Sequence, residues 1–125
     1  MNIPKNLLYT NDHEWIKVDG DNAVIGITDY AQGELGDIVF VEFPNCRDTF
    51  SQNDIFGTIE AVKTLADLYI PISGEIIEIN ESLDSKPENI NSDPYNKGWL
   101  VKIKISDKSE LTSLLDSVKY SDMIK

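Results

Sequence analysis

Lys63 lies between two strand-like runs. The first is IFGTIEA (55–61), and the second begins after the lysine and leads into PISGEI (71–76). A lysine that acts as a nucleophile or forms a Schiff base must lose its proton, and burial or neighbouring cations favour that loss. The charged neighbours here are Glu60 and Asp67, whose carboxylates keep an amine protonated. We therefore interpret Lys63 either as a solvated turn residue or as a point of covalent attachment, because an external enzyme can reach and acylate an amine at a hairpin tip.

His13, the only histidine, lies between Asp12 and Glu14, and all three residue types can bind metal ions. Successive side chains on a strand point to opposite faces, so we do not expect these three to converge on one ion. No second histidine or cysteine cluster supplies further ligands, and we predict no metal site. For His13 we expect a structural role or a contact with a partner.

Nothing else in the sequence resembles a catalytic site. It lacks a paired nucleophile and base, a glycine loop that would hold phosphate, and a P-loop. Its many carboxylates are scattered, as is typical of an acidic surface. We predict no catalytic residue.

Short strands dominate the elements that must position these residues. EWIKV (14–18) and AVIGI (23–27) flank the turn-forming residues DGDN and predict a hairpin. Further strands are expected in DIVFVEF (37–43), IFGTIEA (55–61), GEIIEIN (74–80) and WLVKIKI (99–105). These spacings predict a mainly β fold, an antiparallel sandwich or barrel.

Two of these strands carry expectations about burial. DIVFVEF is apolar enough to be largely buried. In IFGTIEA, strict alternation places Ile55, Gly57, Ile59 and Ala61 on one face of the strand and Thr58 and Glu60 on the other.

Two helices are expected between and after the strands. In TDYAQGELG (28–36), Thr28 can cap the first turn and Gly36 suits a left-handed stop. Near the end, Asp107 and Glu110 have the spacing of a capping box. They precede an apolar stripe at helical spacing, which predicts a C-terminal helix over about 107–125 packed on the sheets; the stripe comprises Leu111, Leu114, Leu115 and Val118.

Length and charge restrict the function. The chain has 125 residues and no internal boundary, so residues 1–125 are expected to form a single domain. Its formal net charge of −11 argues against nucleic acid and against anionic membrane surfaces as partners. The single cysteine, Cys46, excludes an internal disulfide and is expected to be a packed small side chain. No leader or membrane-spanning run is found, which favours a bacterial cytoplasmic protein or a mature form from the mitochondrial matrix.

Several stretches together resemble the H protein of the glycine cleavage system along nearly the whole chain. They fall in that family's order and spacing: HEW (13–15), IGITDYAQGELGDIVFVEFP (25–44), EAVK (60–63), PISGEI (71–76) and NSDPYNKGWLVKIK (91–104). The resemblance implies a barrel-sandwich hybrid of two antiparallel sheets with a short internal helix and a C-terminal helix. It also places the family's lipoyl attachment lysine on Lys63, and Val62 beside it favours lipoate over biotin.

The resemblance implies a carrier and not an enzyme. Lipoic acid would be joined to Lys63 as N6-lipoyllysine by a lipoate-attaching enzyme. The arm would take the aminomethyl group of glycine from the P protein, a pyridoxal-phosphate enzyme, deliver it to the T protein, an aminomethyltransferase, and be reoxidised by the L protein, dihydrolipoamide dehydrogenase. The family expectation is a monomer whose loaded arm folds into a surface cleft, where Glu14, Asp67 and Asp12 are the candidates to hold its cationic amine.

Three alternatives remain open at this stage. An H-like protein could act mainly as a lipoyl donor that relays the cofactor to other enzymes. A non-lipoylated interaction domain could use the same scaffold. A self-sufficient enzyme would need convergent acid/base or metal groups that the sequence does not provide.

Overall fold

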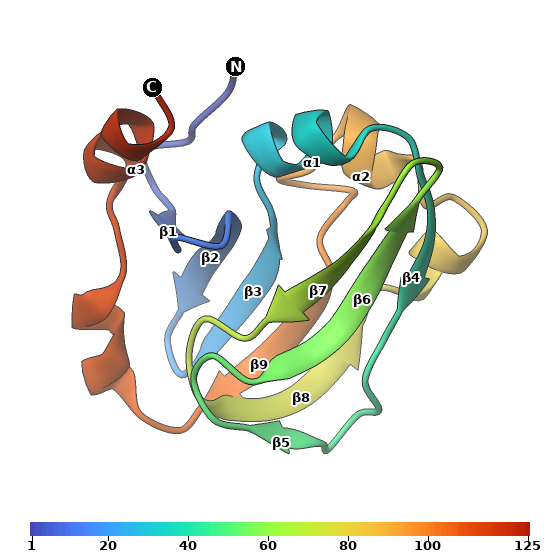
Figure 1. Ribbon diagram of the computed structural model, residues 1–125. Coiled ribbons are helices and arrows are strands. Elements are labelled where there is room, and N and C mark those ends of the chain that lie inside the picture. The colour runs from blue at the N-terminus through green and yellow to red at the C-terminus, as the bar shows by residue number, and fades with distance from the viewer.

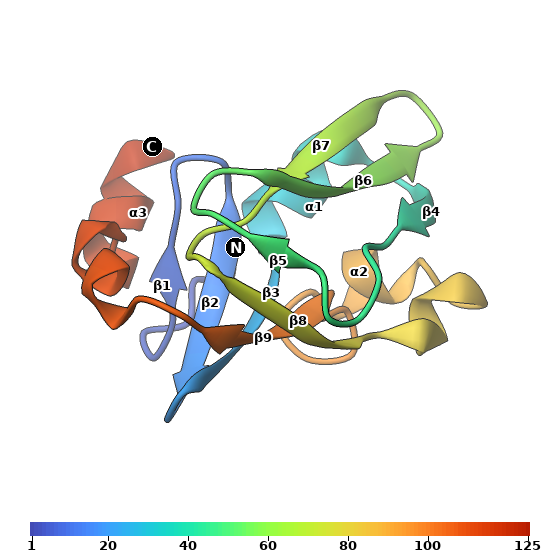
Figure 2. The same cartoon turned by 90° about the horizontal axis from the view of Figure 1, so that it is seen from below.

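Nine β-strands in the computed structural model, which describes residues 1–125, form two antiparallel sheets. The larger sheet has the order β1-β2-β3-β9-β8-β5 and the smaller the order β4-β6-β7. The two sheets face each other (Figures 1 and 2). Their strands are β1 (Leu8–Tyr9), β2 (Glu14–Asp19), β3 (Asn22–Ile27), β4 (Ile38–Glu42), β5 (Thr49–Phe50), β6 (Ile55–Ala61), β7 (Leu65–Tyr69), β8 (Gly74–Ile79) and β9 (Val101–Ile105). The predicted mainly β class is confirmed, and the sheets do not close into a barrel.

The first predicted hairpin forms from local signals. Asp19 pairs with Asn22, which leaves Gly20 and Asp21 as the turn. Gly20 has φ of 62°, a left-handed conformation that glycine adopts without steric cost. β2 and β3 therefore enter the large sheet in the register that puts Ile16 opposite Ile25, and both side chains are fully buried.

The space between the sheets holds the main hydrophobic core. It is a cluster of 18 buried residues contributed by both sheets and by the connection between β8 and β9. Ile59 of the small sheet and Ile76 and Ile103 of the large sheet are fully buried within it. Each such side chain stabilises the fold by about 2 kcal/mol relative to an exposed position. This core fixes the small sheet, and hence Lys63, on the large one.

The expectation that DIVFVEF is largely buried is wrong. Only Ile38 and Val41 of β4 are buried, whereas Val39 and Phe40 are 49% and 50% exposed. The register shifts between Ile38 and Phe40, so that two residues of β4 stand opposite one residue of β6. Such a bulge turns consecutive side chains to the same side of the sheet. Since nothing covers the outer face of the small sheet, these side chains are exposed to solvent.

Strict alternation also fails at the start of β6. Ile55 is 51% exposed and the next residue, Phe56, is buried, because the pairing with β7 shifts between Ile55 and Gly57. Beyond the shift the prediction holds: Ile59 and Ala61 face the core and Glu60 faces solvent. In β9, the strand begins at Val101, two residues later than expected at Trp99.

The short helix forms as predicted. α1 (Asp29–Leu35) begins after Thr28, whose Oγ1 accepts a hydrogen bond from the backbone N–H of Ala31 at 3.2 Å. It ends at Gly36, which has φ of 78°. The long polar connection contains η1 (Glu81–Asp84) and α2 (Asn89–Ser92), which bury Leu83 and Ile90. α1 and α2 lie at the end of the sheets where the β6–β7 hairpin turns (Figure 1).

The prediction of one continuous helix over about 107–125 is wrong. The segment forms a 3₁₀ helix, η2 (Lys108–Ser113), and a separate helix, α3 (Ser117–Met123). Asp107 caps η2 through Ser109, but the Glu110 carboxylate accepts hydrogen bonds from the N–H and hydroxyl of Ser73 and does not close a capping box. The helix is then interrupted because Leu115 exchanges two backbone hydrogen bonds with Tyr9, each of 2.8 Å.

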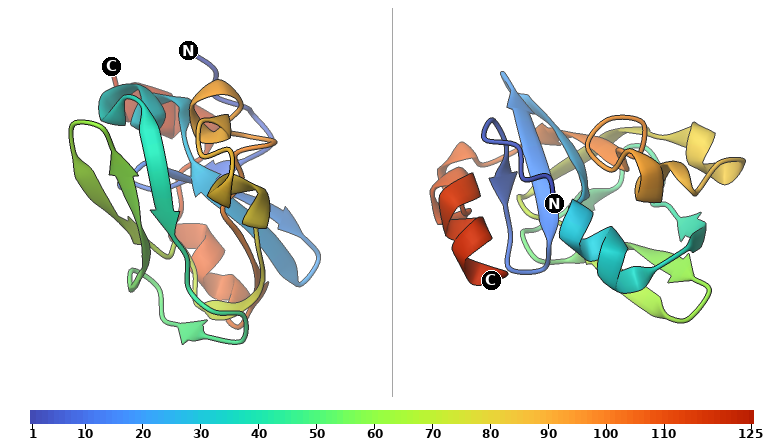
Figure 3. Two further views of the ribbon diagram at one scale, coloured as in Figure 1. Left: turned by 90° about the vertical axis from the view of Figure 1, so that its right-hand side faces the viewer. Right: turned by 90° about the horizontal axis from the view of Figure 1, so that it is seen from above.

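The stripe predicted for this helix is divided accordingly. Leu111 and Leu114 pack against the main core, while Val118 is 67% exposed. α3 instead buries Tyr120 against Leu7, Tyr9 and Trp15, a second small cluster. This helical segment lies on the opposite side of the molecule from the β6–β7 hairpin tip (Figures 1 and 3).

Two further findings concern the surface. Cys46, expected to be packed, is exposed, since the loop after Pro44 carries it outside the core. None of the helices has the length and apolar character that crossing a bilayer requires.

Candidate functional site

Lys63 lies at the tip of the hairpin between β6 and β7, as its position between two alternating patterns predicts. The backbone N–H of Ala61 donates to the carbonyl of Thr64 at 2.8 Å, which leaves Val62 and Lys63 as the turn. The N–H of Val62 donates to the carbonyl of Asp37 at 2.9 Å and ties the tip to the chain that enters β4. Lys63 is exposed and forms none of the three salt bridges in the structure. The amine of Lys63 is therefore accessible, and hydrogen bonds on either side restrain the backbone of the turn.

The aliphatic part of Lys63 lies over Gly36, at the C-terminal end of α1. A Cβ atom at position 36 would be 3.4 Å from Cε and 3.9 Å from Nζ of Lys63. Gly36 thus serves both as the stop of α1 and as the surface on which the lysine chain rests. Since α1 also forms a wall of the neighbouring pocket, the lysine side chain starts its path beside that pocket.

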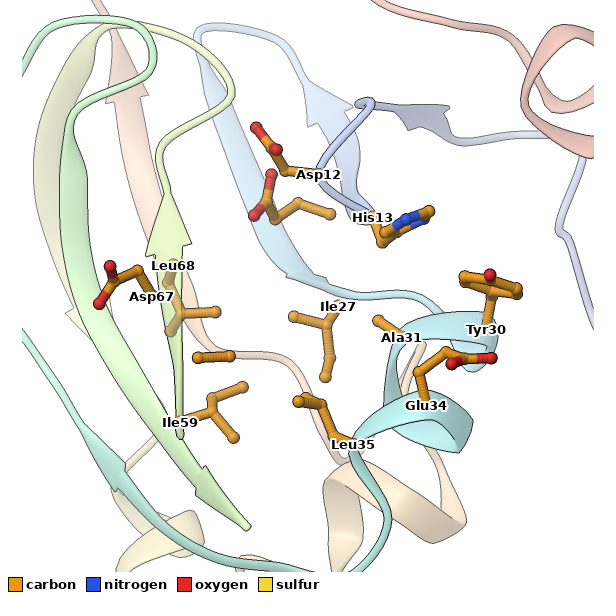
Figure 4. A pocket seen from close by; sticks show the side chains of 12 residues that line it. Asp12, His13, Ile27, Tyr30, Ala31, Glu34, Leu35, Ile59, Asp67 and Leu68 are labelled. Carbon is orange, nitrogen blue, oxygen red and sulfur yellow. The ribbon is translucent and has the colours of Figure 1, made fainter. Parts of the chain in front are cut away.

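The pocket has a volume of about 330 Å³ and lies between α1, the small sheet and the loop before β2 (Figure 4). Apolar side chains dominate its walls: α1 supplies Ala31 and Leu35, and the inner face of the small sheet supplies Ile59 and Leu68. The complete lining is Asp12, His13, Glu14, Ile27, Tyr30, Ala31, Glu34, Leu35, Ile59, Ala66, Asp67 and Leu68. Ala31 and Leu35 stand four residues apart and so share one face of α1, but nothing in the sequence indicates that this face lines a pocket.

Glu14 is the most unusual residue of this lining, because it is a carboxyl group with only 2% of its surface exposed. Its Oε1 accepts a hydrogen bond from the hydroxyl of Thr10 at 2.7 Å, and its Oε2 accepts one from the backbone N–H of Tyr69 at 3.3 Å. Burial raises the pKa of Glu14 to about 8; the negative charge of Asp12 adds to this rise, and the two hydrogen bonds oppose it. Near neutral pH the group is therefore largely protonated and can be ionised by a cation placed beside it.

The other two acidic candidates border the same pocket but are exposed. Asp67 follows the alternation of β7, in which Ala66 and Leu68 face inward, and Figure 4 shows its carboxylate directed away from Ile27 and Leu35. Asp12 lies at the mouth, next to the loop that carries Glu14. The fold thus brings all three sequence-predicted residues to one pocket, with Glu14 alone buried.

His13 lies in a turn and not on a strand, so the argument from strand alternation does not apply to it. Its φ is 67°, and β2 begins one residue later. Asp12, His13 and Glu14 all border the pocket, yet the structure contains no group of three or more His, Cys, Asp or Glu side chains that could hold a metal ion. Burial lowers the pKa of His13, while Asp12 and Glu34 act in the opposite direction.

A buried hydroxyl connects the pocket to the C-terminal helix, and sequence reasoning missed it. The hydroxyl of Tyr120 lies 2.9 Å from Nδ1 of His13 and 2.7 Å from Oγ1 of Thr28. The Tyr120 ring stacks on Tyr9 with centroids 4.6 Å apart, and the His13 ring lies 4.7 Å from that of Tyr30. No local pattern could reveal these contacts, since His13 and Tyr120 are 107 positions apart.

A small β domain that presents one exposed lysine on a backbone-tied hairpin tip, beside a pocket with a buried carboxyl group, belongs to the class of carrier domains. A family model described as "Glycine cleavage H-protein" matches residues 7–125. The chain belongs to the glycine cleavage H-protein family. The "Glycine cleavage system H protein" of Halothermothrix orenii is 56% identical over 121 residues, which cover 97% of this chain and 94% of that protein.

A solved structure agrees with this assignment. The crystal structure of a glycine cleavage system H protein from Mycobacterium marinum superimposes with a TM-score of 0.88 at 36% identity, and 98% of each chain is covered. Members of the family carry lipoate as a component of the glycine cleavage system and are not themselves catalysts. The predicted class, carrier role and fold are thereby confirmed.

Proposed function

We propose that lipoate is joined to this chain by an amide at Nζ of Lys63 and that the resulting arm serves the P, T and L proteins of glycine cleavage in turn. The observation that carries the proposal is the position of Lys63, exposed on a tied hairpin tip with its side chain lying over Gly36 beside the pocket. Acylation removes the charge of the lysine and lengthens its side chain. The restrained backbone of the tip limits the volume that such an arm explores.

The residues around the pocket suit an acylated lysine. A pocket of about 330 Å³ with walls formed by Ala31, Leu35, Ile59 and Leu68 offers apolar surface to a hydrocarbon chain. Its lining includes Leu35, which precedes the glycine on which the lysine rests. A polar end is provided by Glu14, the one buried carboxyl group of the lining. A chain that is apolar along its length and polar at its tip matches this arrangement.

Lipoate, when attached, supplies a disulfide that accepts two electrons together with a one-carbon amine and later gives both up. This chain's own part is binding and shelter. Glu14 is set to ionise opposite a protonated amine, since the attraction of a cation offsets the burial that raises its pKa to about 8. The resulting charge-assisted hydrogen bond would hold the amine. The apolar walls would exclude water, and Asp67 and Asp12 would add negative potential at the mouth.

The test is peptide-level mass analysis of residues 57–76 after expression in a host that attaches lipoate. We expect the mass of a lipoyl amide on Lys63, and none after Lys63→Arg, which retains the charge but cannot be acylated in the same way. The wild-type protein should also support exchange of labelled bicarbonate into the carboxyl group of glycine with the P protein. Unmodified wild-type protein would point to the non-lipoylated interaction domain. Modified protein that fails in the exchange would point to the relay role.

A further inference from the structure

Four exposed apolar side chains surround the hairpin tip on the outer face of the small sheet, and we call them the tip patch: Val39, Phe40, Val62 and Leu65. Their exposed fractions are 49%, 50%, 74% and 65%. Single exposed apolar residues are common, but a group on one uncovered sheet face marks an interaction site. These side chains play no part in the pocket, whose lining comes from the inner face of the same sheet.

The strand register places the tip patch on one face of the small sheet, around Glu60. Phe40 pairs with Glu60, and Glu60 pairs with Leu65, so the three form one row across β4, β6 and β7 on the same face. The bulge in β4 adds Val39 to this face. Val62 lies in the turn next to Lys63, two residues beyond Glu60. The patch therefore reaches from the middle of β4 to the residue that precedes the lysine.

The charges on this face restrict the partner. Lys63 is the only basic residue from Asp37 to Ile72 apart from Arg47, which lies in the loop between β4 and β5. Glu60 stands within the apolar row, and the next row across the sheet carries Glu42 and Asp67. A complementary surface would thus be apolar at its centre and basic opposite these carboxylates.

We propose that the tip patch is the docking surface for the enzyme that attaches lipoate to Lys63, an inference that rests on the proposed function. That enzyme must bring an activated acyl carbon to within bonding reach of Nζ, about 3 Å before reaction. Enzymes that act on the far end of the completed arm meet no such requirement, because the arm itself separates them from the tip. The surface directly beside the lysine is therefore covered by the attaching enzyme.

The acylation of Lys63 requires no group from this chain other than the amine itself. The attaching enzyme removes one proton from the ammonium group of Lys63, and the free amine attacks the carbonyl carbon of an acyl adenylate or an acyl thioester. The new C–N amide bond forms as the bond to the phosphate or thiol leaving group breaks, and the nitrogen gives up its second proton to the departing thiolate or to a base of the attaching enzyme. No oxidation occurs. The carrier's contribution to the rate is then docking alone, which is what the tip patch supplies.

The experiment measures lipoylation of the purified unmodified protein by an ATP-dependent lipoate-attaching enzyme, with intact mass as the readout. The test variant is Phe40→Thr with Leu65→Thr, since threonine keeps the preference for strand. The matched control is Ile55→Thr, which removes an equally exposed apolar side chain from the far end of β6, roughly 20 Å from the tip. We expect kcat/KM to fall by at least about tenfold in the double variant, through KM, and to stay unchanged in the control.

A second readout separates docking from damage to the tip. Acetylation of Lys63 by a small N-hydroxysuccinimide ester should proceed at the wild-type rate in the double variant, because such a reagent needs no docking surface. Normal lipoylation of the double variant would overturn the proposal while leaving the carrier function intact. If the double variant were lipoylated normally but then failed to react with the P protein, the tip patch would be a docking surface for the P protein instead. Failure of the wild-type protein to accept lipoate would instead refute the proposed function.

Discussion

The hydroxyl of Tyr120 lies 2.7 Å from Oγ1 of Thr28, so that the C-terminal helix contacts the residue that caps the helix lining the pocket. The same hydroxyl lies 2.9 Å from Nδ1 of His13, in the loop that leads to Glu14. One fully buried side chain thus joins two walls of the pocket to α3. The C-terminal segment, which lies far from the hairpin tip, is part of the structure that shapes the arm's binding site.

Tyr120→Phe should loosen this junction. Loss of the hydroxyl leaves Nδ1 of His13 without this partner and leaves Oγ1 of Thr28 with only the N–H of Ala31, which should reduce the free energy of unfolding by about 1–3 kcal/mol. Water entering beside the imidazole would lessen the burial that lowers the pKa of His13, and we expect that pKa to rise toward 6.5. His13 is the only histidine, so an NMR titration reports it directly. Tyr9→Phe is the matched control, since the Tyr9 hydroxyl bonds to Pro4, and it should leave the His13 titration unchanged.

Glu14 should make the stability of the protein depend on pH. Because its pKa is raised from 4.5 to about 8, the folded protein binds more protons than the unfolded chain in that range, and the free energy of unfolding falls as pH rises. His13, whose pKa is lowered from 6.5, acts in the opposite direction, and this effect fades above about pH 7. Between pH 7 and 8 the slope should therefore be about −1 kcal/mol per pH unit in urea unfolding. Glu14→Gln should remove this slope, and a slope that persists in the variant would show that another group causes it.

The shelter of the loaded arm should depend mainly on Glu14. Loss of a charge-assisted hydrogen bond in a buried site costs about 1.5–3 kcal/mol, so Glu14→Ala should shorten the lifetime of the aminomethyl-loaded protein by roughly ten- to hundredfold. Asp67→Ala should have a smaller effect, because that carboxylate is exposed and directed away from the pocket interior. Decay of the loaded mass over time measures both. An unchanged lifetime in Glu14→Ala would eliminate its sheltering role.

Two glycines of the same helical segment should respond in opposite ways to alanine. Gly36→Ala places a side chain at φ of 78° and against Cε of Lys63, and we expect a loss of about 1–3 kcal/mol in stability. Gly33→Ala lies within α1 with no atom within 4 Å of the added Cβ, and a gain of about 0.5–1 kcal/mol is expected. Urea unfolding of the two variants provides the comparison. Equal losses at both positions would contradict the role given to Gly36.

The sequence by itself determined the features that depend on neighbours a few residues apart. Alternation over 14–18 and 23–27 defined the first hairpin, and Thr28 and Gly36 marked the ends of α1. Lys63 was placed at a hairpin tip by the two patterns on either side of it. These signals are local, because strand alternation, caps and turns each act over two to four residues.

Only the tertiary structure decided which surfaces were covered and which partners each polar group found. The C-terminal helix is broken because Glu110 finds Ser73 and Leu115 finds Tyr9, contacts that no capping pattern encodes. β4 is apolar yet half exposed, because the small sheet has one face against the core and the other in solvent. The pocket and the raised pKa of Glu14 exist only where α1, the small sheet and the loop before β2 meet. Burial and the electrostatics that follow from it depend on the whole fold, which is why the family resemblance could name Glu14 but the sequence could not describe its environment.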